Sequence, residues 1–350
     1  MIPRAYRGVL PVLLAALLVL ARPAVGAAEE PADVADGSAR IMLLGDSVTH
    51  GSAGDWTWRY RLWRHLDAVG AEADFVGPAH DLADRAGPSQ DYADPGFDRD
   101  HAAVWGMWAS AAMERAAELV LAYRPDVIVV MLGVNDLLGN APADAVLWCL
   151  RRIVEEARTV DPGVDVVLSE VTQTWFTIDG RAAAVNDDLP ALAASLTTPE
   201  SQVAIAHASW GYRIGHTYDT SHPSAQGEVR IAAAVADALS GLGVGAPYLR
   251  PLPTVGNVPR PPVVLRARAA NRAVRLSWDA PAGATSFLVW RRNVTTKERW
   301  HRMPHPVLGT RLRVSGLRNH HRYEFKMKAR KGDKTVKDVT SRVVSARPRR

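Results

Sequence analysis

The chain has 350 residues and a formal net charge of +5, so it is long enough for two domains that each bury a hydrophobic core. Its single cysteine, Cys149, excludes an intramolecular disulfide and lies in an apolar helical pattern that is typical of a buried structural thiol. Residues 263–350 hold 23 Lys and Arg against 5 Asp and Glu, a balance of +18, whereas the remaining 19 basic and 32 acidic residues balance to −13. Two domains with different surface chemistry are therefore expected.

Residues 1–28 have the pattern of a secretory signal peptide. Arg4 and Arg7 precede an apolar run over residues 9–21, and small residues follow around Gly26. The apolar run is too short to span a bilayer. We therefore expect a secreted, extracellular protein without a membrane span.

Short apolar strands alternate with amphipathic helices between residues 39 and 242. Strands are expected at residues 41–44, 73–77, 127–132, 164–168 and 203–206. Helices are expected at residues 57–69, 109–123, 143–160, 182–196 and 225–239, and residues 80–100 are expected to form a long loop. Alternation of this kind predicts an α/β domain built on a mostly parallel sheet.

A proline-rich segment, residues 243–262, predicts a semi-rigid linker after this domain. Beyond it the apolar period changes to two, with strands expected at residues 273–278, 286–290, 311–314 and 321–330. Many short strands in so few residues predict an all-β sandwich over residues 263–348.

Ser47 is the first candidate for chemistry. It follows the first apolar strand in the sequence Gly45-Asp46-Ser47, where strand gives way to helix. In an open parallel sheet, ligands bind at the carboxyl edge on which such a residue lies. On this stretch alone, Ser47 is equally well explained as a helix N-cap or as a nucleophile.

A serine nucleophile needs a base and a group that orients the base. His222 is the candidate base, and Asp219, three residues earlier in a turn-like segment, is placed to accept the second ring N–H. His216 is a weaker alternative because it has no matching acidic partner.

The oxyanion that forms during acyl transfer needs two or three hydrogen-bond donors. The backbone N–H groups of Ser47 and Gly106 and the side-chain amide of Asn135 are the candidates. Asn135 follows a buried strand and is expected at the same sheet edge as Ser47.

The chain resembles the SGNH (GDSL) hydrolase family over roughly residues 40–240. The resemblance is carried, in chain order, by four blocks: Gly45-Asp46-Ser47, Gly106, Gly133-Val134-Asn135-Asp136 and Asp219-Thr220-Ser221-His222. It implies a three-layer α/β/α fold with a flavodoxin-like parallel sheet and an ester hydrolase that needs neither cofactor nor metal. It also implies the catalytic residues Ser47, Asp219 and His222, an oxyanion hole of Ser47, Gly106 and Asn135, and turn-shaping roles for Asp46 and Asp136.

Within that family the chain looks most similar to secreted carbohydrate esterases that remove acetyl groups from xylan and related polymers. Residues 40–47 and 74–77 carry this likeness. One departure is Trp105, which stands where those enzymes have a small, glycine-rich segment and is expected to narrow or reshape the acyl pocket. A lipid or short-chain ester hydrolase with the same triad, and a non-catalytic surface-binding protein, are the alternatives.

The second domain resembles a fibronectin type III module, with Trp278 on its second strand and Leu317 with Tyr323 as the family's tyrosine corner. Alternation over residues 321–330 places Lys326 and Lys328 on an outer face, which Arg291, Lys297 and Lys337 are expected to extend. We expect this basic face to bind an anionic cell-surface polymer rather than nucleic acid. The other expected partner is the acylated polysaccharide or small ester that is hydrolysed.

Overall fold

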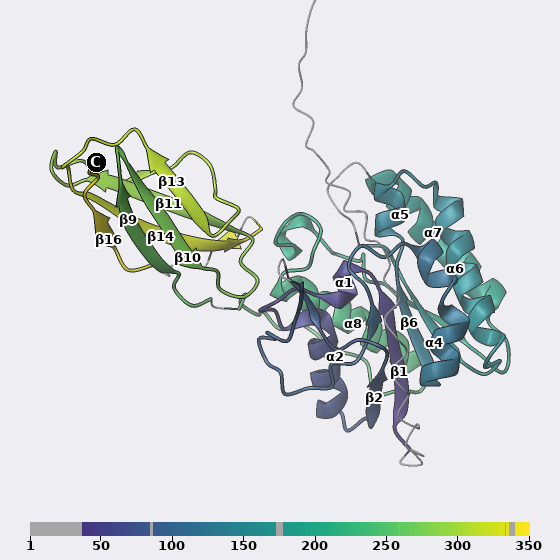
Figure 1. The fold of residues 1–350 in the computed structure, drawn as a ribbon. Helices are drawn as coiled ribbons and strands as arrows, with labels where there is room; N and C mark the ends of the chain where they lie inside the picture. Colours follow the sequence, from purple (N-terminus) through teal and green to yellow (C-terminus); the bar gives the residue numbers. More distant parts are fainter. Residues whose placement is uncertain (1–36, 85–86, 173–177, 259, 333, 336–339) are drawn as a thin grey trace, which may run out of the picture. The chain divides into compact units, whose positions relative to one another are not determined.

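The computed structural model describes residues 37–84, 87–172, 178–258, 260–332, 334–335 and 340–350 (Figure 1). The predicted signal peptide, residues 1–28, lies outside these ranges. The part of the chain from Ser38 to Arg350 forms one compact unit. None of the helices in the described ranges combines the length and apolar character that crossing a membrane requires.

Six parallel strands in the described ranges form the central sheet of the N-terminal domain. Their order is β2-β1-β6-β7-β8, with β5 paired to the carboxyl end of β1. They are β1 (Ala39–Gly45), β2 (Ala73–Val76), β5 (Ala102–Ala103), β6 (Val127–Met131), β7 (Asp165–Ser169) and β8 (Val203–Ala206). Apart from the short β5, this is the flavodoxin-like order, which confirms the predicted fold class.

Helices cover both faces of the sheet (Figure 1). One face carries α2 (Thr57–Ala68) and α8 (Ala225–Gly241). The other carries α3 (Ala109–Met113), α4 (Ala116–Tyr123), α5 (Val134–Leu138), α6 (Ala143–Arg158) and α7 (Asp179–Leu196). Two further short helical elements are α1 (Ser47–His50) and the 3₁₀ turn η1 (Ile214–His216).

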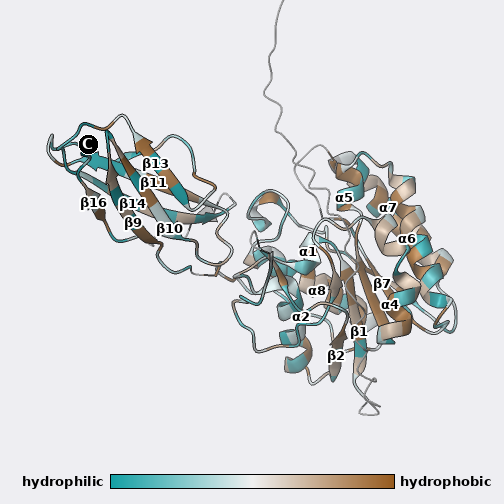
Figure 2. Cartoon of the chain, viewed as in Figure 1, coloured by the Kyte–Doolittle hydropathy of each residue, from teal (hydrophilic) through white to brown (hydrophobic). Residues whose placement is uncertain are grey.

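Strand β1 shows why its sequence is apolar throughout. Ile41 and Leu43 pack into the core under α2 and α8, whereas Met42 and Leu44 pack into the core on the other side of the sheet. Both faces of the strand are therefore buried, as the strongly hydrophobic colour of the central strands in Figure 2 illustrates. Cys149 is buried in the α6 side of this core, as the sequence indicates.

Two predictions of local structure in the N-terminal domain were wrong. The helix expected at residues 109–123 is divided into α3 and α4 by a turn at Glu114 and Arg115, where neither Pro nor Gly marks a break. The loop expected at residues 80–100 contains a small antiparallel hairpin of β3 (Leu82–Asp84) and β4 (Gly87–Ser89). Periodicity over two or three residues is too short to identify such strands.

The C-terminal domain is an all-β sandwich. One sheet has the order β13-β10-β9 and the other the order β12-β11-β14-β15, with β16 also paired to β14. The strands are β9 (Val264–Ala270), β10 (Ala273–Asp279), β11 (Ser286–Asn293), β12 (His301–Arg302), β13 (Arg311–Ser315), β14 (Tyr323–Lys331), β15 (Lys334–Thr335) and β16 (Val344–Ala346). This division into two antiparallel sheets is the fibronectin type III arrangement.

The tyrosine corner is present, since the Arg318 N–H donates to Tyr323 Oη at 3.0 Å.

The predicted basic face is corrected in part. Arg291 pairs with Phe325 and so lies on that residue's side of the sheet, and Lys297 lies in a turn instead of a strand. Lys337 falls outside the described residues.

Candidate active site

The site is built at the carboxyl edge of the sheet, where β1 ends at Gly45. A Cβ at this position would overlap the Thr49 side chain, so the tight strand-to-helix turn requires glycine. Asp46 Oδ1 then accepts a hydrogen bond from the Val48 N–H at 2.9 Å and caps α1. Ser47 is therefore the first residue of α1 and not its cap.

Three of the expected residues form one continuous relay. His222 Nε2 lies 2.9 Å from Ser47 Oγ, and His222 Nδ1 lies 2.7 Å from Asp219 Oδ2. Although 175 positions separate Ser47 and His222 in the sequence, the fold brings them into hydrogen-bond contact. A hydroxyl, an imidazole and a carboxylate in this order can perform nucleophilic acyl substitution.

The turn before α8 fixes the carboxylate of this relay. Asp219 Oδ1 accepts the backbone N–H groups of His222 at 2.8 Å and Ser221 at 3.1 Å. Burial by itself would raise the pKa of Asp219. The hydrogen bonds and the nearby imidazole outweigh burial, so the pKa of Asp219 lies below its usual value. Asp219 is thus ionised at neutral pH and able to orient His222.

The loop of Gly106 is held against the same edge from two sides. The Val104 N–H donates to Gly45 O at 3.0 Å, and the Asn135 side chain donates to Met107 O, also at 3.0 Å. Gly106 has φ +79°, a backbone conformation that other residues adopt only with strain. Within the described ranges, the N–H groups of Ser47 and Gly106 donate to no protein acceptor, so both are available to an incoming oxyanion.

The side-chain amide of Asn135 is already engaged. Its Nδ2 donates to Asp46 Oδ2 at 3.2 Å as well as to Met107 O. Asp136, the next residue, accepts the Ala109 N–H with both carboxylate oxygens and so fixes the start of α3. Asp46 and Asp136 therefore hold turns, and Asp46 in addition orients the amide that the sequence assigns to the oxyanion hole.

Two aromatic residues stack on the imidazole ring of His222. The sequence analysis assigned neither of them a role at His222. The Trp105 ring lies 4.5 Å from the imidazole with an interplanar angle of 24°, and the Tyr218 ring lies 5.7 Å from it at 19°. Trp105 is 41% exposed, so its ring covers the imidazole at the surface of the domain. Tyr218 directly precedes Asp219 in the sequence, which is the only signal that could have suggested it.

Two histidines, the fully buried His101 and the partly buried His50, support the Trp105 segment. His50 Nδ1 accepts the Trp105 N–H at 3.1 Å, while its Nε2 lies 3.3 Å from Asp81 Oδ2. His101 Nε2 contacts Asp81 O at 2.9 Å, and its Nδ1 accepts the Ala103 N–H. Burial lowers the pKa of His101 to about 2, so this ring is neutral.

His50, Asp81 and His101 are also the one group in the described ranges whose ligand atoms lie close enough together to hold a metal ion. The donor set fits a metal poorly because both nitrogens of His101, and Nδ1 of His50, are occupied by protein hydrogen bonds.

His216, the alternative base, has both ring nitrogens engaged away from Ser47. Its Nδ1 accepts the Arg213 N–H, and its Nε2 contacts Arg230.

The fold is that of the three-layer α/β/α class of ester hydrolases. Residues 43–230 match the GDSL-like Lipase/Acylhydrolase family, which is more than half of the chain, and the chain belongs to this family of ester hydrolases. A comparison with curated proteins gives no match.

Among solved structures, the chain is similar to a carbohydrate esterase family 3 protein from Talaromyces cellulolyticus. The two are 30% identical with a TM-score of 0.51, over 58% of this chain and 97% of that chain. The same values hold for a mutant acetyl esterase solved with acetate ion. The fn3 domain of human collagen alpha-1(XX) chain is 27% identical over 27% of this chain and 89% of that chain, with a TM-score of 0.22.

Proposed function

We propose that this protein is a secreted carbohydrate esterase that removes acetyl groups from a polysaccharide. The observation that carries the proposal is the contact of Ser47 Oγ with His222 Nε2 at the sheet edge. The acetyl group is supported by 30% identity to an acetyl esterase solved with acetate, and the polymer by equal identity to a family 3 carbohydrate esterase. Secretion is proposed from residues 1–28, whose composition is that of a signal peptide.

The proposed reaction has two acyl transfers. Ser47 Oγ forms a bond to the ester carbonyl carbon while His222 Nε2 takes the hydroxyl proton, and His222 then gives this proton to the departing sugar oxygen. Asp219 holds the ring in the correct tautomer. Water, deprotonated by the same nitrogen, then releases acetate from Ser47 and restores the hydroxyl.

The negative charge on the carbonyl oxygen is greatest in the two tetrahedral intermediates. In the proposed mechanism the N–H groups of Ser47 and Gly106 donate to this oxygen, with Asn135 as the third donor. Because its Nδ2 bonds Asp46 and Met107 in the substrate-free protein, Asn135 has to share or redirect one of these hydrogen bonds.

The direct test is acetate release from a panel of neutral acetylated polysaccharides, set beside hydrolysis of p-nitrophenyl esters of increasing acyl length. We expect acetate to be released from at least one polymer, with the acetyl ester as the best of the synthetic esters. A preference for long acyl chains would support the lipid-ester alternative. No turnover of any ester would support the surface-binding alternative.

A second proposed activity is binding of an anionic polymer by the C-terminal domain. Two cations contact the Trp300 ring, with the Arg292 guanidinium 4.8 Å and the Lys326 ammonium 4.7 Å from its centroid. Lys328 lies on the same side of β14 as Lys326. The balance of +18 over residues 263–350 supports a polyanion, such as teichoic acid or a uronate-bearing polysaccharide.

A further inference from the structure

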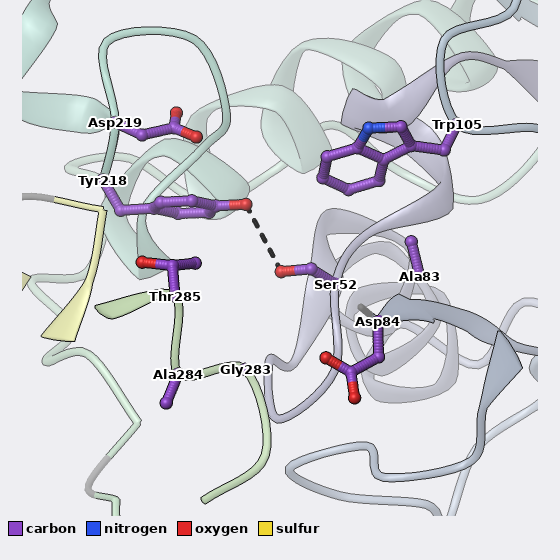
Figure 3. A pocket seen from close by; sticks show the side chains of 9 residues that line it. All are labelled: Ser52, Ala83, Asp84, Trp105, Tyr218, Asp219, Gly283, Ala284 and Thr285. Atoms are coloured by element: carbon purple, nitrogen blue, oxygen red, sulfur yellow. Dashed lines mark hydrogen bonds between the residues drawn. The ribbon is translucent and has the colours of Figure 1, made fainter. Parts of the chain in front are cut away.

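A pocket of about 420 Å³ lies beside the relay and is lined by both domains. The volume falls within the range of about 300–1,000 Å³ that is usual for ligand sites. Residues of the esterase domain and of the loop between β10 and β11 face one another across it (Figure 3). The lining residues are Ser52, Ala83, Asp84, Trp105, Tyr218, Asp219, Gly283, Ala284 and Thr285.

The pocket and the relay share their walls. Asp219 belongs to both, and Trp105 and Tyr218 line the pocket while their rings stack on His222. The Tyr218 hydroxyl lies 3.3 Å from Ser52 Oγ, which joins two of the pocket's polar groups (Figure 3). A molecule held in the pocket would therefore contact Asp219 and the two rings that stack on His222, although neither Ser47 nor His222 itself lines the pocket.

A buried ion cluster fixes the C-terminal domain at this place. The Asp55 carboxylate contacts the Lys331 ammonium, and its other oxygen lies 3.2 Å from Arg260 Nη2. Lys331 and Arg260 are only 5% and 9% exposed. Buried charges are strongly unfavourable unless they are paired, so separation of the domains would leave Asp55 without both cations.

The two backbones also come into direct contact. A Cβ at Gly283 would overlap Ala53 O, and a Cβ at Gly332 would overlap Tyr218 O, so glycine is needed at both positions of the C-terminal domain. The proline-rich segment lies along the esterase domain as well. Its Asn257 Oδ1 accepts the Ala225 N–H at 3.2 Å. The loop of residues 282–285 thus has a fixed position beside the relay.

We propose that the C-terminal domain supplies one wall of a glycan subsite, in which a neutral sugar unit next to the acetylated one binds. This inference rests on the proposed function. The lining offers an aromatic surface, three hydroxyl groups and the Asp84 carboxylate, which suit the apolar faces and hydroxyl groups of a sugar. None of the nine lining residues is a cation, so the pocket favours a neutral sugar over a uronate.

The test fills the pocket from the C-terminal domain in the full-length protein. Thr285→Trp is compared with Thr296→Trp, which places the same side chain in an exposed turn of the same domain. For each protein, kcat/KM is measured for acetate release from a neutral acetylated xylo-oligosaccharide and for p-nitrophenyl acetate. The measure is the kcat/KM for the oligosaccharide divided by the kcat/KM for p-nitrophenyl acetate. We expect Thr285→Trp to lower this ratio at least fivefold and Thr296→Trp to leave both values unchanged.

A second variant guards against misfolding of the first. Asp84→Asn changes the opposite wall at an exposed side chain and is expected to lower the same ratio at least threefold. Binding of the oligosaccharide to the Ser47→Ala protein, measured by calorimetry, should weaken in parallel when either pocket change is added. An unchanged ratio and unchanged binding in both variants would overturn the inference. Absence of acetate release from every oligosaccharide by the unaltered protein would instead refute the proposed function, and this inference with it.

Discussion

Trp105 stacks on His222 with the ring centroids 4.5 Å apart, and its backbone N–H is held by His50 Nδ1. The contact restricts the imidazole to one plane, the plane in which Nε2 faces Ser47 and Nδ1 faces Asp219. Trp105 is thus a positioning residue, and its effect on the reaction passes through the orientation of His222.

The first prediction follows from this contact. Trp105→Ala should lower kcat for p-nitrophenyl acetate about tenfold with a smaller change in KM, because a misoriented base affects the chemical step more than binding of a small ester. Trp105→Phe, which keeps an aromatic ring, should recover most of the loss. Trp148→Ala removes an exposed indole on α6 and serves as the control. Failure of Trp105→Phe to recover kcat would show that stacking is not the cause.

The second prediction concerns the relay. Ser47→Ala and His222→Ala should each lower kcat by roughly 10⁴-fold or more, and the double variant should be little worse than either, because the two groups act as one unit. Steady-state kinetics of the three proteins would measure this. Multiplying effects would contradict the assignment. A large effect of His216→Ala with an active His222→Ala protein would identify His216 as the base.

The third prediction concerns Asn135. If its amide serves the oxyanion, Asn135→Ala should cost on the order of 10²–10³ in kcat with little change in KM, since the charge develops only in the transition state. Asn135→Asp keeps the size of the side chain and removes the donor, so it should be at least as impaired. If kcat falls less than tenfold, the two backbone N–H groups suffice and Asn135 serves only to hold Met107 O and Asp46 together.

The proximity of Ser47, His222 and Asp219 could be expected from the sequence because the three residues stand at the ends of predictable elements. Ser47 follows a fully apolar strand, and parallel strands end at one edge of a sheet, so the meeting with the residues before α8 could be expected from the order of elements alone. Asp219 and His222 are close in sequence, and their contact depends only on a local turn.

Other relationships depend on distances that no local pattern contains. Lys331 and Asp55 are 276 positions apart, and their contact requires two folded domains to meet in one orientation. The stacking of Trp105 depends on His50, which is 55 positions earlier. Arg291 was assigned to the wrong face because the side of a residue follows from the register of β11 against β14, and the register pairs it with Phe325.

The fourth prediction uses Asp46, which is 1% exposed. Burial raises the pKa of Asp46 from 3.8 to about 7, against the opposing effects of the Val48 N–H and the nearby His222. The folded protein therefore keeps a proton that the unfolded chain releases above about pH 4. Linkage then requires the contribution of Asp46 to stability to be fully present below that pH and to be lost as the pH rises through about 7.

Asp46→Asn should remove this dependence, because asparagine is uncharged and caps helices as well as aspartate does. Between pH 5 and pH 8 the free energy of unfolding of the original protein should fall further than that of the variant. The difference between the two changes should be on the order of 2 kcal/mol. Urea unfolding at the two pH values would measure the difference. Asp187→Asn, at an exposed position of α7, is the control and should leave the dependence intact. Parallel pH dependences of the Asp46 variant and the original protein would contradict the assigned pKa.

The last prediction concerns the cations around Trp300. Lys326→Glu combined with Lys328→Glu should abolish binding of the full-length protein to polygalacturonate or teichoic acid at low salt, because both side chains lie on one face of β14. Binding by the original protein should weaken steeply between 50 and 500 mM NaCl, since at about 0.1 M salt exposed charges are screened beyond roughly 10 Å. Co-sedimentation with the polymer would measure both effects.

The matched control is Arg311→Glu with Arg313→Glu. It makes the same change in net charge on exposed positions of β13, in the other sheet of the sandwich. If the face around Trp300 is the binding surface, this control should reduce the affinity only slightly. Equal loss in the two double variants would show that net charge alone draws the polymer, and binding that is indifferent to salt would exclude an electrostatic surface altogether.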